Sequence, residues 1–521
     1  MYKANDKSLP MDFSWIGNWS ARRAILTPNK EAIYDNMEDK RYNFQEIENR
    51  GNRLARVLLN MGLQKGDRVA AFTTNRMEMI DLFFATGKIG AIFVPFNVRL
   101  APAEIEQLTK KMDPKILFYE TKVQEKVQTI KDLDLIKNNI VFNDKGFEGD
   151  KSYYDLVEKV SDSPIEKPEI NFEDPHLILF TGGTTGLPKG AVLSHREIFW
   201  NSVNTIMSWG LRPDDVQPLL YPLFHTGGWN VLILPFIHLG AKSILMGDFD
   251  PVETLKVIEK EKCTIVIGVP TMFHMIANQK EFETANFDSV RIFISGGAPC
   301  PVAIMENYWK KGKPFKMGYG LTEVGPNNFY LPEEHIKEKP TSVGLPVFHC
   351  EMKLIDPETE KEVAQGEVGE LLLKGPHIFS GYWEEPEETE EVIEEDGFVH
   401  TGDLAKQDND GYYYIVGRRK EMYISGGENV FPVEIEEVLY KHPAIDEAAV
   451  IGVPDDKWGE VGKAFITLKK GKSTNSDDIR NYLSDKLAKY KIPKYFEIRD
   501  SLPMSGTGKI LKKELEKEEK A

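Results

Sequence analysis

The stretch TGGTTGLPKG, residues 181–190, is the most informative part of the chain. It lies between two apolar runs, residues 176–180 and 191–193, which have the length and composition of strands. Its glycines allow the backbone to turn its N–H groups inward, and its threonines add hydroxyl donors. Lys189 adds a positive charge. Together these groups predict a concave donor surface for the oxygens of a polyphosphate.

The loop differs from the Walker A phosphate-binding loop, whose pattern is Gly-x-x-x-x-Gly-Lys-Ser/Thr. Here Pro188 precedes the lysine and Gly190 follows it. Kinase-type and GTPase-type functions are therefore disfavoured. Taken alone, the stretch could also be a mobile surface turn, because glycine-rich turns are common.

Three further motifs follow the loop at distances too large for local structure: GYGLTE at residues 318–323, the segment 412–420, and TGK at residues 507–509. With these motifs in view, the chain resembles the adenylate-forming superfamily of acyl-CoA synthetases, firefly-type luciferases and nonribosomal-peptide adenylation domains. The resemblance extends from about residue 25 to about residue 515.

Composition narrows the class of protein. A chain of 521 residues is too long for one core, and its 41% hydrophobic and 28% charged residues are typical of globular proteins. A net charge of −17 argues against nucleic acid as a partner. The acidic segment 384–396 is interpreted as solvated surface.

The cysteines and the apolar runs bear on the compartment. Cys263, Cys300 and Cys350 are an odd number without metal-ligand spacing, which fits a reducing cytoplasm. Residues 1–12 contain no signal-peptide apolar region, and the run 231–239 is too short to span a bilayer. We therefore expect a cytoplasmic protein with no membrane span.

Alternation of strand and helix patterns predicts an α/β fold with largely parallel sheets. We expect a large N-terminal domain, residues 1–417, built from two α/β sheet subdomains and a β-rich lobe near residues 342–416. A small mobile α+β domain, residues 418–521, is expected to follow a hinge near Lys420. The tail after Leu511 is rich in Lys and Glu and is either a solvated helix or disordered.

Helix and strand patterns locate the expected elements. Expected helices are residues 43–61, a segment through 79–85, a segment from 102, one from 194, 432–440 and 477–487. Expected strands are residues 68–72, 91–95, 116–119, 264–267, 291–295, 351–355, 370–374, 412–416, 448–451 and 464–468.

The resemblance implies that ATP activates a carboxylic acid, with the phosphate loop holding the β- and γ-phosphates and Glu323 holding Mg²⁺. Thr322 is implied to contact the α-phosphate. The implied ATP- or AMP-binding residues are Thr181, Gly182, Gly183, Thr184, Thr185, Gly186, Lys189, Gly296, Gly297, Ala298, Gly318, Tyr319, Gly320, Leu321, Asp403 and Arg418. Among these, Tyr319 matches the ring on adenine, and Asp403 and Arg418 match the ribose ligands. The alternatives are a Gly-flanked core turn at Tyr319, a turn residue at Asp403 and a surface salt bridge at Arg418.

Lys509 matches the family lysine that bridges the substrate carboxylate and the nucleotide during adenylation. A long lysine stem can carry a compact charge into a site from a mobile domain. The family often has arginine four residues later, where this chain has Lys513. A solvated lysine in a basic tail is the alternative.

The small domain is implied to act twice, by rotating about Lys420 between the two half-reactions. In the second, coenzyme A would meet the glycine-rich segment Ser425, Gly426, Gly427 and Glu428. Glycines let the backbone approach the pantetheine without side-chain obstruction.

By family position, the acid pocket is lined by His225, Gly228, Trp229, Val269, Met272 and Gly318. This surface is apolar and has no obvious cationic residue to pair with a second carboxylate, which favours a monocarboxylic aliphatic or aryl acid. His225 is either a gate in the tunnel, and on that ground a candidate catalytic residue, or a packed core histidine.

The leading hypothesis is an ATP-dependent acyl-CoA synthetase for medium- or long-chain fatty acids. The alternatives are an aryl-acid CoA ligase (benzoate, coumarate or succinylbenzoate type) and a stand-alone adenylation enzyme that loads a carrier protein. A non-catalytic nucleotide-binding protein is a rival from another class, disfavoured by retention of the loop, Glu323 and Lys509. The sequence is compatible with a homodimer but does not fix the oligomeric state.

Overall fold

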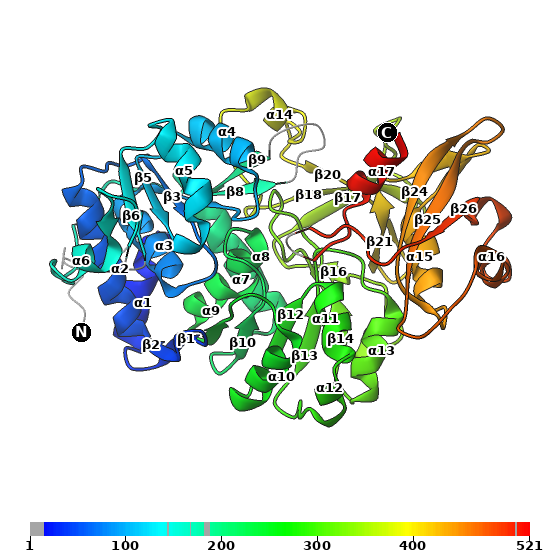
Figure 1. Ribbon diagram of the computed structural model, residues 1–521, viewed down its shortest axis with the longest axis horizontal. Coiled ribbons are helices and arrows are strands. Elements are labelled where there is room, and N and C mark those ends of the chain that lie inside the picture. The colour runs from blue at the N-terminus through cyan, green and yellow to red at the C-terminus, as the bar shows by residue number, and fades with distance from the viewer. Residues whose placement is uncertain (1–14, 143–144, 167, 182–187, 506–507, 521) are drawn as a thin grey trace.

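The computed structural model describes residues 15–142, 145–166, 168–181, 188–505 and 508–520. Two large sheets flanked by helices form the N-terminal part, and a smaller sheet with its helices forms the C-terminal end of the elongated molecule (Figure 1). The predicted α/β fold, with a large N-terminal region and a small C-terminal one, is therefore confirmed.

An eight-stranded sheet carries the phosphate-loop segment. Five neighbouring strands, together with the adjoining β8, are parallel, and β9 is antiparallel to both of its neighbours, β8 and β19. In spatial order the strands are β19 (Gly381–Tyr382), β9 (Lys189–Ser194), β8 (Pro175–Thr181), β4 (Ile92–Phe96), β3 (Arg68–Phe72), β5 (Ile116–Tyr119), β6 (Asn138–Val141) and β7 (Lys151–Ser152).

A seven-stranded sheet forms the second half, and all its pairs are parallel except the edge pair β1–β2. In spatial order its strands are β14 (Phe315–Met317), β13 (Ile292–Ser295), β12 (Ile265–Gly268), β10 (Val216–Leu219), β11 (Lys242–Leu245), β1 (Glu31–Asp35) and β2 (Lys40–Asn43).

Helices cover both sheets, and the predicted starts of two of them are confirmed by capping boxes. The Asn43 side chain caps one helix together with Glu46, and Ser194 caps another together with Glu197. The helices of the N-terminal part are η1 (Ile16–Asn18), α1 (Trp19–Leu26), α2 (Phe44–Asn60), α3 (Met77–Ile89), α4 (Pro102–Met112), η2 (Thr121–Val123), α5 (Gln124–Asp132), α6 (Tyr153–Val157), α7 (His195–Trp209), α8 (Thr226–Gly228), η3 (Trp229–Ile233), α9 (Leu234–Leu239), α10 (Pro251–Lys260), α11 (Pro270–Ala277), α12 (Lys280–Thr284), α13 (Val302–Lys310), η4 (Glu333–His335) and α14 (Pro386–Glu390).

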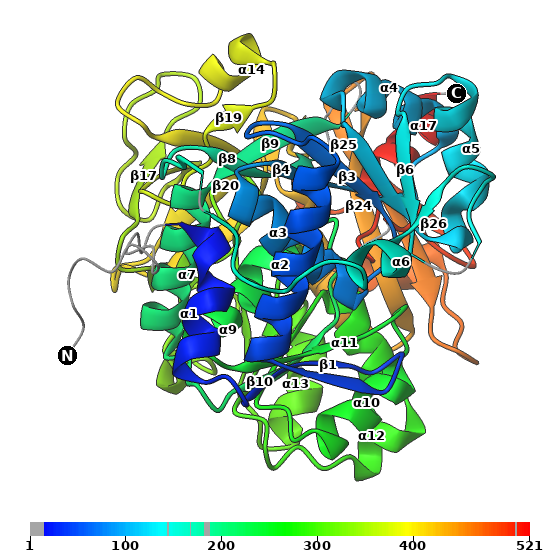
Figure 2. The same cartoon turned by 90° about the vertical axis from the view of Figure 1, so that its left-hand side faces the viewer.

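One apolar core joins the two large sheets. Every residue of α3 is buried, and α2 lies beside it, as Figure 2 shows. The Trp229 indole stacks on the Phe83 ring at 4.9 Å between centroids. The predicted core segment 231–239 is buried except at its C-terminal end, within η3 and α9. No helix in the described ranges is both long and apolar enough to cross a membrane.

A β-rich lobe follows the second sheet. Its four strands are antiparallel, in the order β17 (Glu351–Ile355), β18 (Val368–Lys374), β20 (Val399–Gln407) and β21 (Tyr413–Arg418). A two-stranded ribbon, β15 (Phe329–Tyr330) with β16 (Leu345–Pro346), lies before them in the chain.

The C-terminal unit has its own sheet and its own apolar clusters. The strands are β22 (Tyr423–Ser425), β23 (Glu428–Val430), β24 (Ile445–Asp455), β25 (Gly459–Leu468) and β26 (Tyr495–Ile498), and the helices are α15 (Pro432–Tyr440), α16 (Ser476–Ser484), η5 (Lys489–Lys491) and α17 (Lys512–Lys520). The tail left open by the sequence is thus the helix α17, anchored by the buried Leu515.

Candidate active site

The two ends of the phosphate-loop segment lie on the neighbouring strands β8 and β9. Thr181 and Lys189 are paired across the two strands, so both ends of the loop are held side by side. The Lys189 Nζ lies 4.9 Å from the centre of the Tyr382 ring on the adjacent strand β19. The tip of the loop, with the predicted ligands Gly182, Gly183, Thr184, Thr185 and Gly186, lies outside the described residues.

Tyr382 also links this hairpin to the predicted metal ligand. Its hydroxyl donates a hydrogen bond to Glu323 Oε1 at 3.0 Å, and the backbone carbonyl of Glu323 accepts from Phe379 N at 2.9 Å. Burial and the Glu323 carboxylate raise the pKa of Tyr382, so this hydroxyl stays a donor. Thr322 is buried beside Glu323.

The predicted adenine and ribose residues are joined by hydrogen bonds. The Tyr319 hydroxyl donates to Asp403 Oδ2 at 2.7 Å, and Arg418 Nε lies 3.1 Å from Asp403 Oδ1. Asp403 and Arg418 are register partners on β20 and β21. Burial raises the pKa of Asp403, while the charge of Arg418 and the Tyr319 hydroxyl lower it. The arginine side chain is 57% exposed.

The glycines near Tyr319 differ in how closely other atoms approach them. A Cβ atom at Gly320 would lie 2.3 Å from the carbonyl oxygen of Gly325, so only glycine fits there. Gly296 has no atom closer than 3.6 Å to that position. Leu321 packs on the core, and Ala298 lies in the turn after β13.

Lys509 reaches this site from the C-terminal unit. Its Cε would lie 3.0 Å from a Cβ atom on Gly297, a residue with φ of +85°. The neighbouring Gly508 carbonyl accepts a hydrogen bond from Thr271 Oγ1 at 2.7 Å. Burial and Arg418 lower the pKa of Lys509 to about 8, and Asp403 opposes them. The structure therefore holds this lysine against the large N-terminal part.

The predicted acid-pocket residues are not all on one open surface. Val269 lies beside Gly508, because a Cβ atom on that glycine would be 3.3 Å from the Val269 Cγ2. Met272 lies in the helix α11, which begins directly after Val269. Trp229 is fully buried and its Nε1 donates to the Leu223 carbonyl, which makes it a core residue. A Cβ atom on Gly228 would lie 2.4 Å from the Pro222 carbonyl oxygen, so this glycine permits a close backbone approach.

His225 caps the short helix α8. Its Nδ1 accepts a hydrogen bond from Gly227 N at 3.1 Å. Burial, with a smaller effect of Lys509, lowers the pKa of His225 to about 3. The ring is therefore neutral at physiological pH, which disfavours acid–base chemistry and fits a packed or gating role.

The predicted coenzyme A segment is the tight β22–β23 hairpin. Gly426 and Gly427 have φ values of +63° and +91°, which favour glycine. Ser425 pairs with Gly459, and a Cβ atom on Gly426 would lie 2.9 Å from the Trp458 ring. Glu428 is exposed. The hairpin is well formed within the C-terminal sheet.

Lys420 lies in the turn between β21 and β22, where the chain passes from the lobe to the C-terminal sheet. A lysine that the sequence did not single out, Lys512, lies next to this passage. It forms ion pairs with Glu421 at 3.1 Å and Glu436 at 2.8 Å. The helix α17 is thereby tied to the segment that follows Lys420.

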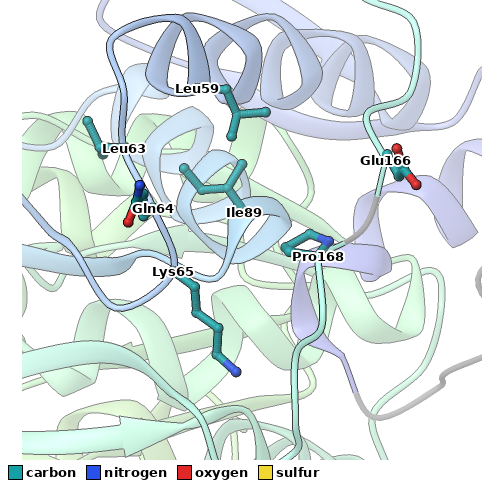
Figure 3. Close-up of a pocket in the computed structure, with 7 residues that line it drawn as sticks. All are labelled: Leu59, Leu63, Gln64, Lys65, Ile89, Glu166 and Pro168. Carbon is teal, nitrogen blue, oxygen red and sulfur yellow. The ribbon is translucent and has the colours of Figure 1, made fainter.

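The hollow drawn in Figure 3 lies away from these residues. It is lined by residues from α2, the loop after α2, the end of α3 and the segment before β8. These residues are Leu59, Leu63, Gln64, Lys65, Ile89, Glu166 and Pro168. None of these residues belongs to the predicted site, and Lys65 is engaged there with Asp174 at 2.6 Å.

Two family models match this chain. Residues 20–383 match the model for the AMP-binding enzyme family, and residues 434–509 match that for the AMP-binding enzyme C-terminal domain. The chain belongs to the AMP-binding enzyme family. It is an AMP-forming acid–thiol ligase, which uses ATP and coenzyme A to convert an acid to its thioester.

Three similar proteins are CoA ligases. A feruloyl-CoA synthase from Amycolatopsis sp is 37% identical over 96% of this chain and 98% of its own. An indoleacetate–CoA ligase from Aromatoleum aromaticum is 34% identical over 95% and 96%. The crystal structure of an anthranilate CoA ligase in complex with anthranoyl-AMP is 29% identical over 100% and 99%, with a TM-score of 0.89.

Proposed function

We propose that this ligase activates an aromatic monocarboxylic acid, forming an aryl-acyl adenylate and then the aryl-acyl-CoA. Relatives named for ferulate, indoleacetate and anthranilate, each aligned over nearly the whole chain, support this choice. They favour the aryl-acid alternative over the fatty acid that led the sequence interpretation. The position of Lys509 against Gly297 is the structural observation that carries the chemistry.

In the first half-reaction, the substrate carboxylate attacks the α-phosphorus of ATP and pyrophosphate leaves. Two anions must approach each other, so positive charge near the reacting atoms lowers the barrier. Lys509 supplies that charge from the C-terminal unit, and Lys189 supplies it at the base of the phosphate hairpin. Asp403 accepts hydrogen bonds from the ribose, with Arg418 beside it, and Tyr319 holds the carboxylate in place.

Glu323 fits a Mg²⁺ ion that is shared with the nucleotide. Tyr382 occupies Oε1, and no described residue donates a hydrogen bond to Oε2. Magnesium often uses only one or two protein carboxylates and takes its remaining ligands from phosphates and water. Consistently, no group of three metal-binding side chains occurs among the described residues. When bound, the ion would neutralise charge on the phosphate oxygens.

The second half-reaction requires a different placement of the C-terminal unit, because Lys509 fills the position next to Gly297. Rotation about Lys420 would withdraw the lysine and bring the Gly426–Gly427 hairpin toward the adenylate. Hinges need only a few residues to absorb the change in backbone angles. The thiolate of coenzyme A then attacks the acyl carbon, and AMP leaves.

The test is pyrophosphate release with a panel of acids at fixed ATP and coenzyme A, with the thioester product identified by mass. We expect kcat/KM for cinnamate or benzoate derivatives to exceed that for decanoate by about 10-fold or more, since pockets discriminate shape by a few kcal/mol. Higher kcat/KM for decanoate would return the function to fatty-acid activation. Use of acyl-carrier protein in preference to coenzyme A would make it a loading enzyme.

A further inference from the structure

Lys316 on β14 is a buried lysine that the mechanism above does not use. Its side chain is among the most enclosed charged groups of the chain, with only 3% of the residue exposed. The Nζ lies 5.1 Å from the centre of the Trp209 ring and 4.8 Å from that of Tyr330. Within the described ranges, no oxygen accepts a hydrogen bond from it and no carboxylate pairs with it.

Such a site is costly for a lysine. An ammonium group has three donors, and taking it out of water without partners is strongly unfavourable. The two aromatic faces return only about 0.5–2 kcal/mol through cation–π attraction. Burial accordingly lowers the pKa of Lys316 to about 7, with Glu333 of η4 acting weakly in the opposite direction. The described residues therefore offer these donors no acceptor.

Lys316 lies on the acid side of the site. Side chains two positions apart on a strand point to the same face, and Gly318 continues β14 through a hydrogen bond from its N to the Ser295 carbonyl at 2.8 Å. A Cβ atom on Gly318 would lie 4.0 Å from the Trp209 Cη2. The Trp209 indole thus extends from Gly318, a predicted acid-pocket residue, to Lys316.

Trp209 is itself fixed in orientation. Its Nε1 donates a hydrogen bond to the Phe329 carbonyl at 3.0 Å, and Phe329 packs against Tyr319 with 5.6 Å between ring centres. The indole face is therefore held at a set distance from the adenine and ribose residues. The fixed Trp209 ring, with the Lys316 ammonium group beside it, suits a flat substrate whose end remote from the reacting carboxylate is polar.

We propose that Lys316, set against Trp209, is a specificity residue that donates a hydrogen bond to an oxygen at the end of the aromatic acid remote from the reacting carboxylate. The proposal rests on the proposed function and narrows it to aryl monocarboxylic acids that carry a phenolic oxygen at the remote end. It departs from the expectation that the pocket has no cation. A purely apolar acid leaves the buried donors without a partner and is discriminated against.

The experiment compares two acids of nearly equal size, 4-hydroxycinnamate and 4-methylcinnamate, by the ratio of their kcat/KM values in pyrophosphate release. In the wild-type enzyme we expect a preference of about 10–100-fold for the hydroxy acid, the range for leaving a buried polar group without its partner. Lys316→Met, of similar volume, should reduce that ratio by about 10-fold, mainly through KM for the hydroxy acid. Lys256→Met, on the exposed surface of α10, is the matched control and should keep the wild-type ratio.

The outcomes separate the two claims. Equal losses on both acids in Lys316→Met, together with a lower melting temperature, would make the lysine structural and overturn the inference. If the wild-type enzyme uses both acids equally well, the aryl-acid function stands and the inference fails. If it uses decanoate and neither cinnamate, both fail. Should Lys316→Met not fold, Lys316→Gln provides the same comparison, with an intermediate ratio expected because one neutral donor group remains.

Discussion

The nucleotide side and the acid side of the site are built differently. On the nucleotide side, polar side chains bond to each other across strands and turns, as in Tyr319–Asp403 and Tyr382–Glu323. On the predicted acid side, Trp229 and Gly228 are tightly packed, and the proposed polar contact is the enclosed Lys316. We therefore expect nucleotide chemistry to depend on a few charged groups, and acid selection to depend on how buried elements pack.

Among the steady-state and stability measurements, the largest effect is expected on the nucleotide side, from Asp403→Ala. The change removes a carboxylate that accepts from Tyr319 and faces Arg418, so both partners lose their acceptor. Loss of a charged hydrogen-bond acceptor costs about 2–3 kcal/mol, or roughly 30–150-fold in kcat/KM for ATP. Steady-state kinetics with ATP varied would measure it. An unchanged KM and kcat for ATP would remove Asp403 from the ribose site.

On the acid side, Gly228→Ala should act on folding rather than on acid length. The new Cβ would lie 2.4 Å from the Pro222 carbonyl oxygen, and overpacking of this kind costs about 1–3 kcal/mol. Gly296→Ala is the control for folding, since its nearest atom lies at 3.6 Å. Denaturant titrations compare the two variants. A Gly228→Ala protein as stable as the wild type, with a shortened range of acids, would restore this glycine to the pocket wall.

The pH dependence of adenylation should report Lys509. Its pKa is lowered to about 8, so the lysine is charged below that pH and loses its charge as the pH rises through it. We expect kcat/KM to fall about tenfold per pH unit above this value, because kcat/KM follows the free enzyme. The profile of Lys509→Arg should lack this limb at pH 8–10, since a guanidinium stays charged. The same alkaline limb in both enzymes would assign it to another group.

The smallest effect is expected from Tyr382→Phe. The change removes one hydrogen bond from a neutral donor to the Glu323 carboxylate, worth about 1.5 kcal/mol, or roughly tenfold. A titration of activity with Mg²⁺ should show a higher half-saturating concentration in the variant. No shift would mean that Tyr382 does not orient the carboxylate.

Local patterns predicted much of the fold. The helix of residues 44–60 follows from its capping box and apolar stripe, and β5 and α15 have the predicted bounds. The apolar runs on either side of the phosphate loop predicted two strands, and the structure contains them as the antiparallel pair β8 and β9. These features depend on residues that are close together in the sequence, so local patterns are enough to predict them.

Other parts of the site depend on contacts between distant segments. Tyr382 lies 59 residues from Glu323, and nothing around it marks it as a partner. Family position predicts Trp229 in the acid pocket, and its stacking on Phe83 in the structure is a contact between distant segments that the sequence does not show. Lys316 lies between apolar neighbours in a short strand, and only the fold shows that no acceptor among the described residues faces it. The one signal in the sequence for such a site is a charged residue flanked by apolar residues.

The central claim is that Lys509 serves the first half-reaction from the position seen here and that rotation about Lys420 serves the second. Single-turnover kinetics of both half-reactions on Lys509→Ala and Lys420→Pro test it most directly. Lys509→Ala should slow adenylate formation by about 100-fold or more while sparing thioester formation from supplied acyl-AMP. Lys420→Pro should do the reverse, because proline restricts the backbone angle that must change. Equal loss of both steps in both variants would contradict the account and leave a single static site.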